Sequence, residues 1–210
     1  MKKLFLMLLV LISFSCKNEK KTEVSSEEIK PKQVLEAVIL PDDVTSFRKV
    51  GLDISEINEM FLDQNAHLLT RNQDSSKSSY ASTKKVGVDY AEVYKASIIA
   101  KKGSKGNLIG LRIAGNYPDR VDAVFNLENG TVKGVEKSRD FEDENANIED
   151  LGNGWYKCSV FAKVSADEVM LFMGPTIGNR EANTWTIKTQ AICNVNILAS
   201  SLALEKVKYE

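Results

Sequence analysis

The sequence predicts an all-β protein, an antiparallel β-sandwich. Apolar and polar residues alternate over short runs through most of the chain, and turn residues such as Gly, Pro, Asn and Asp separate the runs. Roughly seven to ten short strands follow from this pattern, without the βαβ alternation of a parallel sheet. Two packed antiparallel sheets are therefore expected.

Residues 1–15 have the pattern of an export signal. Lys2 and Lys3 precede an apolar run from Leu4 to Ile12, which is too short to cross the ~30 Å hydrocarbon core of a bilayer as a helix. Ser15 then precedes Cys16 where cleavage is expected. This resembles a bacterial lipoprotein signal, which implies an acylated Cys16 and lipid anchoring in the cell envelope, at the outer membrane, with the leaflet left open. The alternative is an ordinary secretory signal in which Cys16 has no role.

Residues 16–33 are charged, contain Pro31 and lack apolar periodicity. This composition predicts a flexible tether between the lipid and a single folded domain over residues 34–210. Strand-like alternation begins at Val34.

The N-terminal third of that domain is predicted to mix strand, helix and loop. Residues 34–40 form an apolar run that ends at Pro41 and predicts a strand. Within 53–69 a short helix is expected, because four apolar residues fall near helical spacing: Ile54, Ile57, Phe61 and Leu62. Residues 72–85 are rich in Ser, Thr, Asn and Lys and predict a polar loop.

The rest of the chain has a regular strand pattern. Asn129-Gly130 predicts a tight hairpin, because both residues accept a positive φ. The expected strands cover 94–100, 108–114, 121–127, 131–135, 155–164, 169–173 and two stretches within 184–204.

Four segments of this second half occur in a characteristic order. They are Tyr-Lys-Ala-Ser-Ile-Ile-Ala-Lys-Lys-Gly at 94–103, Ala-Val-Phe-Asn-Leu-Glu-Asn-Gly-Thr-Val at 123–132, Ala-Asn-Ile-Glu-Asp-Leu-Gly-Asn-Gly-Trp-Tyr-Lys-Cys-Ser-Val at 146–160, and Val-Asn-Ile-Leu-Ala at 195–199 with Leu204-Glu205. Together they resemble the jelly-roll carbohydrate-binding modules of phage tail proteins and polysaccharide-degrading enzymes. The match spans residues 94–205. It departs from the family at Lys157, where Arg is usual, and over 34–89. The resemblance implies a jelly-roll sandwich and a glycan ligand.

The strand that begins at Trp155 supplies the first candidate binding face. Tyr156, Cys158, Val160 and Ala162 alternate onto one side and are expected to face the sandwich interior. Trp155 and Lys157 lie on the other side, with Ser159 and Phe161. An aromatic ring stacks on the apolar face of a sugar while polar groups bind its hydroxyls. The alternative for Trp155 is a buried ring that closes the end of the core.

Four further residues are candidates for ligand binding. Trp185 follows a polar stretch at 178–184 and is a candidate stacking ring, or else a half-buried strand residue. Arg112, on the polar face of its strand, suits an acidic sugar, or is simply solvated. Tyr117 and Arg120 belong to a loop that either lines one end of a cleft or is a plain turn.

Composition narrows the function classes. Lys and Arg number 28 against 29 Asp and Glu, spread along the chain, so nucleic acid is not an expected partner. His67 is the single histidine and no nucleophile motif surrounds it, so neither a Ser-His-Asp centre nor a His and Cys metal cluster is expected. No cofactor is expected; structural calcium stays open, although no calcium-loop spacing is visible. Cys158 and Cys193 either form a disulfide or are reduced core residues.

The expected function is a non-catalytic, envelope-anchored module that binds a glycan or polysaccharide. The alternative is a structural or adhesion module that binds a protein partner. A polysaccharide lyase or glycoside hydrolase is least favoured, because a glycosidase needs two carboxyls held across a cleft. The acids within 140–144 lie in a polar stretch that predicts a solvated loop.

Overall fold

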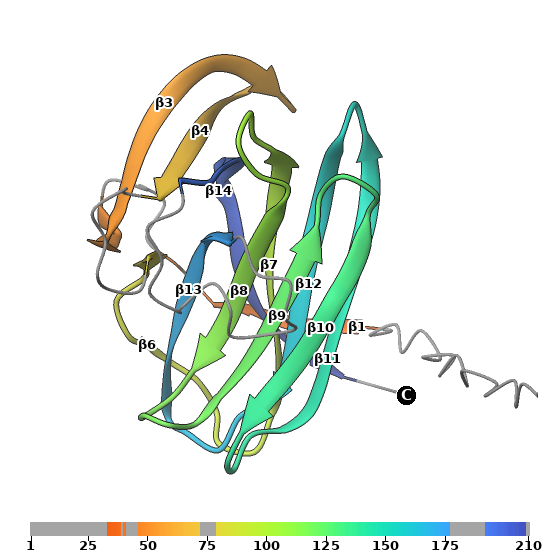
Figure 1. Ribbon diagram of the computed structural model, residues 1–210. Helices are drawn as coiled ribbons and strands as arrows, with labels where there is room; N and C mark the ends of the chain where they lie inside the picture. The colour runs from red at the N-terminus through yellow and green to blue at the C-terminus, as the bar shows by residue number, and fades with distance from the viewer. Residues whose placement is uncertain (1–32, 39, 41–45, 72–78, 177–191, 209–210) are drawn as a thin grey trace, which may run out of the picture.

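A computed structural model describes residues 33–38, 40, 46–71, 79–176 and 192–208 of the chain. In these residues two antiparallel sheets of seven strands each pack face to face (Figure 1). The predicted β-sandwich is thereby confirmed, and it is compatible with a jelly-roll-like domain. No helix among these residues is long and apolar enough to cross a bilayer.

The first sheet has the order β11-β12-β7-β14-β4-β3, with β1 paired to β14. Its strands are β1 (Gln33–Val38), β3 (Leu52–Phe61), β4 (Gln64–Arg71), β7 (Val93–Lys102), β11 (Glu142–Gly152), β12 (Trp155–Lys163) and β14 (Asn194–Lys208). The second sheet has the order β10-β9-β8-β13-β5-β2, with β6 paired to β13. Its strands are β2 (Arg48–Val50), β5 (Tyr80–Ser82), β6 (Val86–Gly87), β8 (Leu108–Ala114), β9 (Arg120–Asn126), β10 (Thr131–Ser138) and β13 (Glu168–Thr176).

The main core lies between the two sheets and follows the alternation in the sequence. Burial of apolar side chains from both sheets is the dominant stabilising contribution of such a core. The expected inward set of β12 is confirmed, since Cys158, Val160 and Ala162 are fully buried in this core and Tyr156 packs against it. The partners from β7 and β8 are Ala96, Ile98, Ala100, Ile109, Leu111 and Ile113.

The prediction of a short helix within 53–69 is wrong, because these residues form the hairpin of β3 and β4. Ile54 packs against the main core, whereas Ile57 and Phe61 pack into a second cluster on the opposite face of the sheet. In the ladder Glu56 faces His67 and Met60 faces Asn65, so residues 57–59 bulge opposite Ala66 alone. Because this strand buries apolar side chains on both of its faces and contains a bulge, its apolar residues are spaced three and four positions apart, which is also the spacing of an amphipathic helix.

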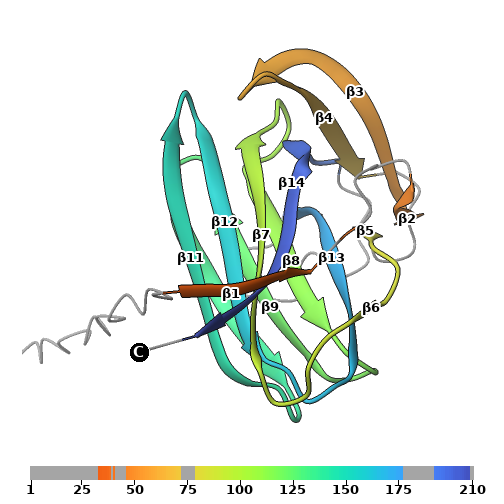
Figure 2. The same ribbon diagram turned by 180° about the vertical axis from the view of Figure 1, so that it is seen from behind.

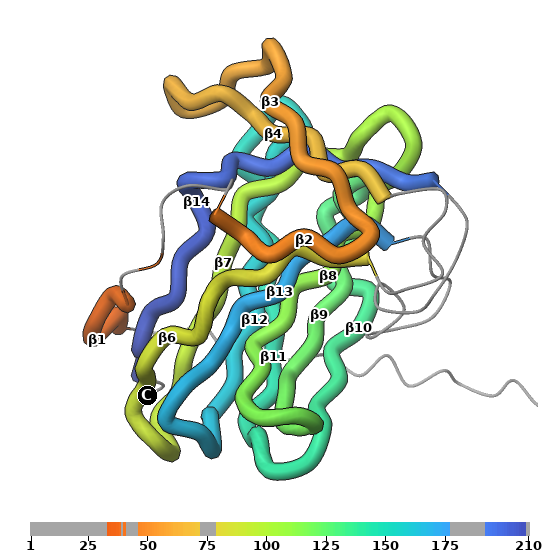
Figure 3. The backbone as a smooth tube through the Cα atoms, turned by 90° about the vertical axis from the view of Figure 1, so that its left-hand side faces the viewer, coloured from red at the N-terminus to blue at the C-terminus, as the bar shows by residue number. Residues whose placement is uncertain are grey.

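The β3–β4 hairpin arches over one end of the sandwich (Figures 1 and 3). Leu62 and Asp63 form its tip, both with a positive φ. Figure 2 shows β1 running crosswise to β7 and β12, and its ladder joins it to the C-terminal part of β14. The chain after the predicted tether therefore enters the fold beside the C-terminal strand.

We predict that Gly174→Ala destabilises the sandwich. A Cβ at this position of β13 would lie 2.8 Å from the backbone oxygen of Ser79, which cannot move aside like a flexible side chain. The expected loss in the free energy of unfolding is about 1–3 kcal/mol, measured by urea denaturation.

Gly87→Ala is the matched control, because a Cβ there has nothing within 4 Å. This substitution should leave stability unchanged or slightly raised, since alanine restricts the unfolded chain. Equal midpoints for the two variants would contradict the close approach of backbone at Gly174.

Candidate functional site

The four family-like segments meet at the end of the sandwich that carries the β3–β4 hairpin. Trp155 lies opposite Lys101 in the ladder, and the Lys101 ammonium lies 5.8 Å from the centre of the Trp155 ring. Gly130, at the Asn-Gly turn, touches the ring of Tyr156, since a Cβ there would be 2.7 Å from it. The third segment therefore packs against both the first and the second.

Asn194, the residue that precedes the fourth segment, closes the same end of the molecule. The side chain of Asn194 fills the turn at 103–106, where its Oδ1 accepts the Lys105 N–H at 2.8 Å and its Nδ2 donates to Ser104 at 3.2 Å. A Cβ on Gly103 would overlap this amide. The contacts among the four segments thus build one end of the fold, and they are sufficient to explain the segments without a ligand.

Trp155 is buried, with 1 % of its surface exposed. The ring of Phe61 stacks on it, at 5.1 Å between centroids and 11° between planes. Ala66 and Leu198 complete this second cluster. The interpretation of Trp155 as an exposed sugar-stacking ring is therefore corrected, because Phe61 occupies the place that a sugar would take. The alternative of a buried tryptophan is the one observed, on the outer face of the first sheet.

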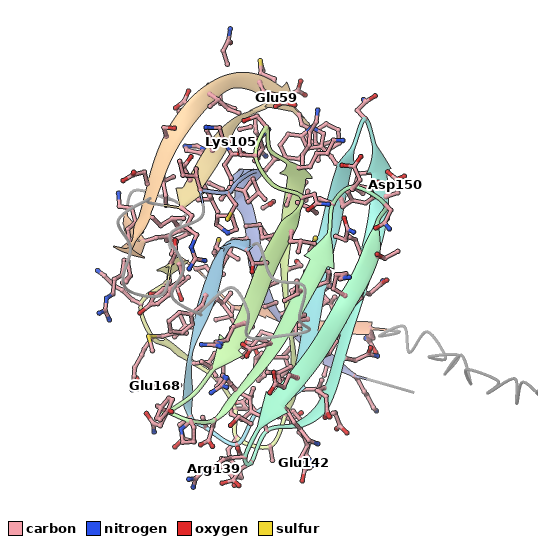
Figure 4. All side chains as sticks on the ribbon, viewed as in Figure 1. Glu59, Lys105, Arg139, Glu142, Asp150 and Glu168 are labelled. Atoms are coloured by element: carbon pink, nitrogen blue, oxygen red, sulfur yellow. The ribbon has the colours of Figure 1, made fainter. Side chains whose placement is uncertain are left out.

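Glu59 fastens the hairpin to this face. One carboxylate oxygen accepts a hydrogen bond from the Lys101 ammonium at 2.8 Å, and the other accepts one from the side-chain amide of Asn196 at 3.0 Å. Figure 4 shows Glu59 on the arch, at the end of the molecule opposite Arg139 and Glu142. Ionic and aromatic contacts together hold the sheet curled over Trp155.

Lys157 remains on the outer face of β12, where it is half-buried and faces Glu149 and Ile99 in the neighbouring strands. Its strand neighbours Ser159 and Phe161 are buried. The structure thus brings Lys157 and Trp155 to one face, as the alternation predicts. It does not give that face an accessible aromatic ring on β12.

Arg112 and Arg120 converge on the fully buried carboxylate of Asp122. Arg112 donates to both carboxylate oxygens, to Oδ2 at 2.9 Å, and Arg120 donates to Oδ2 at 3.1 Å. The guanidinium of Arg112 also lies 5.7 Å from the centre of the Phe172 ring. An acidic sugar at Arg112 would compete with Asp122 for the same donors, and its binding there stays a prediction.

Tyr117 is 93 % exposed in the turn between β8 and β9. Tyr90, which the sequence reasoning missed, is 64 % exposed in the turn before β7. The two tyrosines belong to different turns. The side chain of Arg120 is held at Asp122, and a cleft lined by Tyr117 and Arg120 stays a prediction. Trp185 and Cys16 lie outside the part of the chain that the structure describes.

An open groove of about 520 Å³ lies beside β1. Its lining comes from β1, from the end of β6 with the segment after it, from the start of β7 and from the residue before β13: Glu36, Ala37, Val38, Gly87, Val88, Asp89, Tyr94 and Asp167. Sequence reasoning missed this groove, because its residues come from four separate segments and form no local motif.

Tyr94 is the buried member of the groove lining, with 2 % of its surface exposed. Its hydroxyl oxygen accepts the backbone N–H of Asp89 at 2.8 Å. Burial raises the pKa of Tyr94, against a smaller lowering by this hydrogen bond. The hydroxyl therefore keeps its proton at neutral pH and is able to donate it.

Within the described ranges, no group of three or more His, Cys, Asp or Glu side chains is placed to hold a metal ion. His67 lies on β4 between Glu56 and Ile197 in the ladders.

No protein-family model and no curated protein matches this chain.

Cys158 and Cys193 are free thiols, so the disulfide considered from the sequence is not formed. Burial raises the pKa of both thiols, and that of Cys193 to about 11, against a smaller lowering by Arg71. Both are therefore protonated and shielded at neutral pH.

We predict that neither buried thiol reacts with iodoacetamide in the native protein at pH 8. Both should take up one label each in urea without reductant, as seen by peptide mass mapping. A sample reduced before labelling is the control and should give the same pattern. A disulfide would leave both cysteines unlabelled until reduction.

We also predict that Phe61→Ala uncovers Trp155. The experiment uses a Trp185→Phe background, because the chain has two tryptophans. Acrylamide quenching of Trp155 fluorescence should increase, and stability should fall by about 2 kcal/mol as a partly buried ring is lost.

Met60→Ala is the control for this variant, because Met60 is the exposed neighbour on β3. It should change neither quenching nor stability appreciably. Unchanged quenching in Phe61→Ala would contradict the stacked arrangement.

Proposed function

We propose that this protein is a non-catalytic glycan-binding module, held at the bacterial cell envelope by acylated Cys16. The groove beside β1 is the observation that carries the proposal. Its volume, about 520 Å³, lies within the ~300–1,000 Å³ range of small-molecule sites. One or two sugar units are of this size.

The lining of the groove suits a ligand rich in hydroxyl groups. Carboxylates of Glu36, Asp89 and Asp167 accept hydrogen bonds, and the Tyr94 hydroxyl is a donor. Ala37, Val38 and Val88 supply an apolar part for the C–H groups of a sugar ring. Directional polar groups around a small apolar surface are typical of specific ligand sites.

The position of the groove agrees with display from a membrane. β1 contributes Glu36, Ala37 and Val38 to the groove and follows directly after the predicted tether at 16–33. The tether would hold the groove at the envelope, within reach of extracellular or periplasmic polysaccharide.

A protein partner is the second candidate function. Val34 and Leu35 are exposed on β1, and a strand edge of this kind accepts an added strand from another protein. A stoichiometric partner from envelope extracts that is released by Leu35→Lys, and is indifferent to sugars, would favour this function.

We predict that Glu36→Ala with Asp167→Ala weakens polysaccharide binding about tenfold or more, because two acceptors for sugar hydroxyls are lost. Affinity electrophoresis against a panel of soluble polysaccharides identifies a ligand, and calorimetry then compares the variants.

The control is Glu128→Ala with Glu142→Ala. It removes the same charge from two exposed ion pairs outside the groove, which contribute little to stability. Retention of wild-type affinity is expected. Failure of every polysaccharide to retard the wild-type protein would refute the proposed function.

A further inference from the structure

The charge of the groove narrows the class of glycan. Its eight lining residues include three carboxylates, from Glu36, Asp89 and Asp167, and no Lys, Arg or His. Carboxylate oxygens are acceptors only, so they favour a ligand that brings donors and disfavour one that brings negative charge.

Lys206 contacts this region from β14, where it stands opposite Glu36 in the ladder, and its ammonium is shared between two acids. Its ammonium lies 2.9 Å from Asp89 and 3.4 Å from Glu92. Four carboxylates, from Glu36, Asp89, Glu92 and Asp167, thus stand against one ammonium, which leaves three negative charges. The potential at the groove therefore attracts cations and repels uronates and sulfated sugars.

Tyr94 adds a second requirement for the ligand, which does not follow from the charge of the groove. Its buried hydroxyl accepts the Asp89 N–H, and its own proton has no acceptor among the residues that the structure describes. Because the groove is open, this proton faces either water or a ligand, and a ligand oxygen at this point would be able to accept it. The ligand should then carry an oxygen acceptor close to its cationic group.

We propose that the groove binds glycans with free amino groups, the unacetylated amino sugars. This inference rests on the proposed glycan-binding function and names its ligand class. The sugar ammonium lies among the carboxylates of Glu36, Asp89 and Asp167, a neighbouring hydroxyl oxygen accepts the Tyr94 proton, and ring C–H groups contact Val38 and Val88. N-acetylation removes the charge and enlarges the substituent, and a uronate reverses the charge.

The test uses the full chain in a non-ionic detergent and calorimetric titration with four probes of equal length. These are β-1,4-linked glucosamine oligomers, their N-acetylated counterparts, oligogalacturonate and oligolysine. The glucosamine oligomer should bind at least about tenfold more tightly than the N-acetylated one. This advantage should shrink between 50 mM and about 500 mM salt, because salt screens exposed charges.

Charge-removing variants separate this inference from the function on which it rests. Glu36→Gln with Asp167→Asn keeps an acceptor oxygen at each position and removes the charge, so the preference for amino sugars should fall severalfold while neutral sugars bind as before. Glu128→Gln with Glu142→Gln removes the same charge elsewhere and should leave the preference intact. Tyr94→Phe should weaken the glucosamine oligomer and leave oligolysine unaffected, with circular dichroism to verify folding.

Three results would overturn the inference. Equal affinity for acetylated and free amino sugars would remove the charge preference and leave the glycan-binding function standing. Binding of oligolysine as tight as that of the glucosamine oligomer, insensitive to Tyr94→Phe, would replace the sugar by a basic peptide. Absence of binding by any saccharide would end both proposals.

Discussion

The bulge of β3 opposite Ala66 determines how one end of the first sheet is covered on its outer face. It turns Ile57, Glu59 and Phe61 toward the outer face of the first sheet, where they cover Trp155 and bind Lys101 and Asn196. One end of that face becomes a second hydrophobic cluster. The proposed binding site lies elsewhere, beside β1, where no hairpin folds over the sheet.

The family-like segments acquire a structural meaning from this arrangement. Gly-Asn-Gly-Trp-Tyr forms a turn in which Gly152, Asn153 and Gly154 all have a positive φ, followed by a buried Trp155 and a Tyr156 packed on Gly130. Such a pattern is required by the backbone and by packing, whatever ligand the module binds. A resemblance based on residues that maintain the fold indicates a similar fold, but it says little about the ligand.

Much of the fold was predictable from local pattern, and little of the candidate site was. Alternation along β12 predicted the inward residues correctly, because burial with a period of two can be read from neighbouring positions. The same reasoning failed at β3, where one strand serves two hydrophobic clusters, and at Trp155, whose cover comes from Phe61. The groove brings Glu36 next to Asp167 through the closing of the sandwich, which no local spacing reveals.

The ladder between β1 and β14 gives the molecule a mechanical asymmetry. Any tension carried by the predicted tether would enter the fold at Gln33, which pairs with Lys208 at the end of that ladder. Force applied at the end of an antiparallel pair separates its hydrogen bonds one after another, whereas most strands of the sandwich are held between two neighbours. Glu36, Ala37 and Val38 would leave with β1, so a strong pull would dismantle the groove while the two sheets stayed packed.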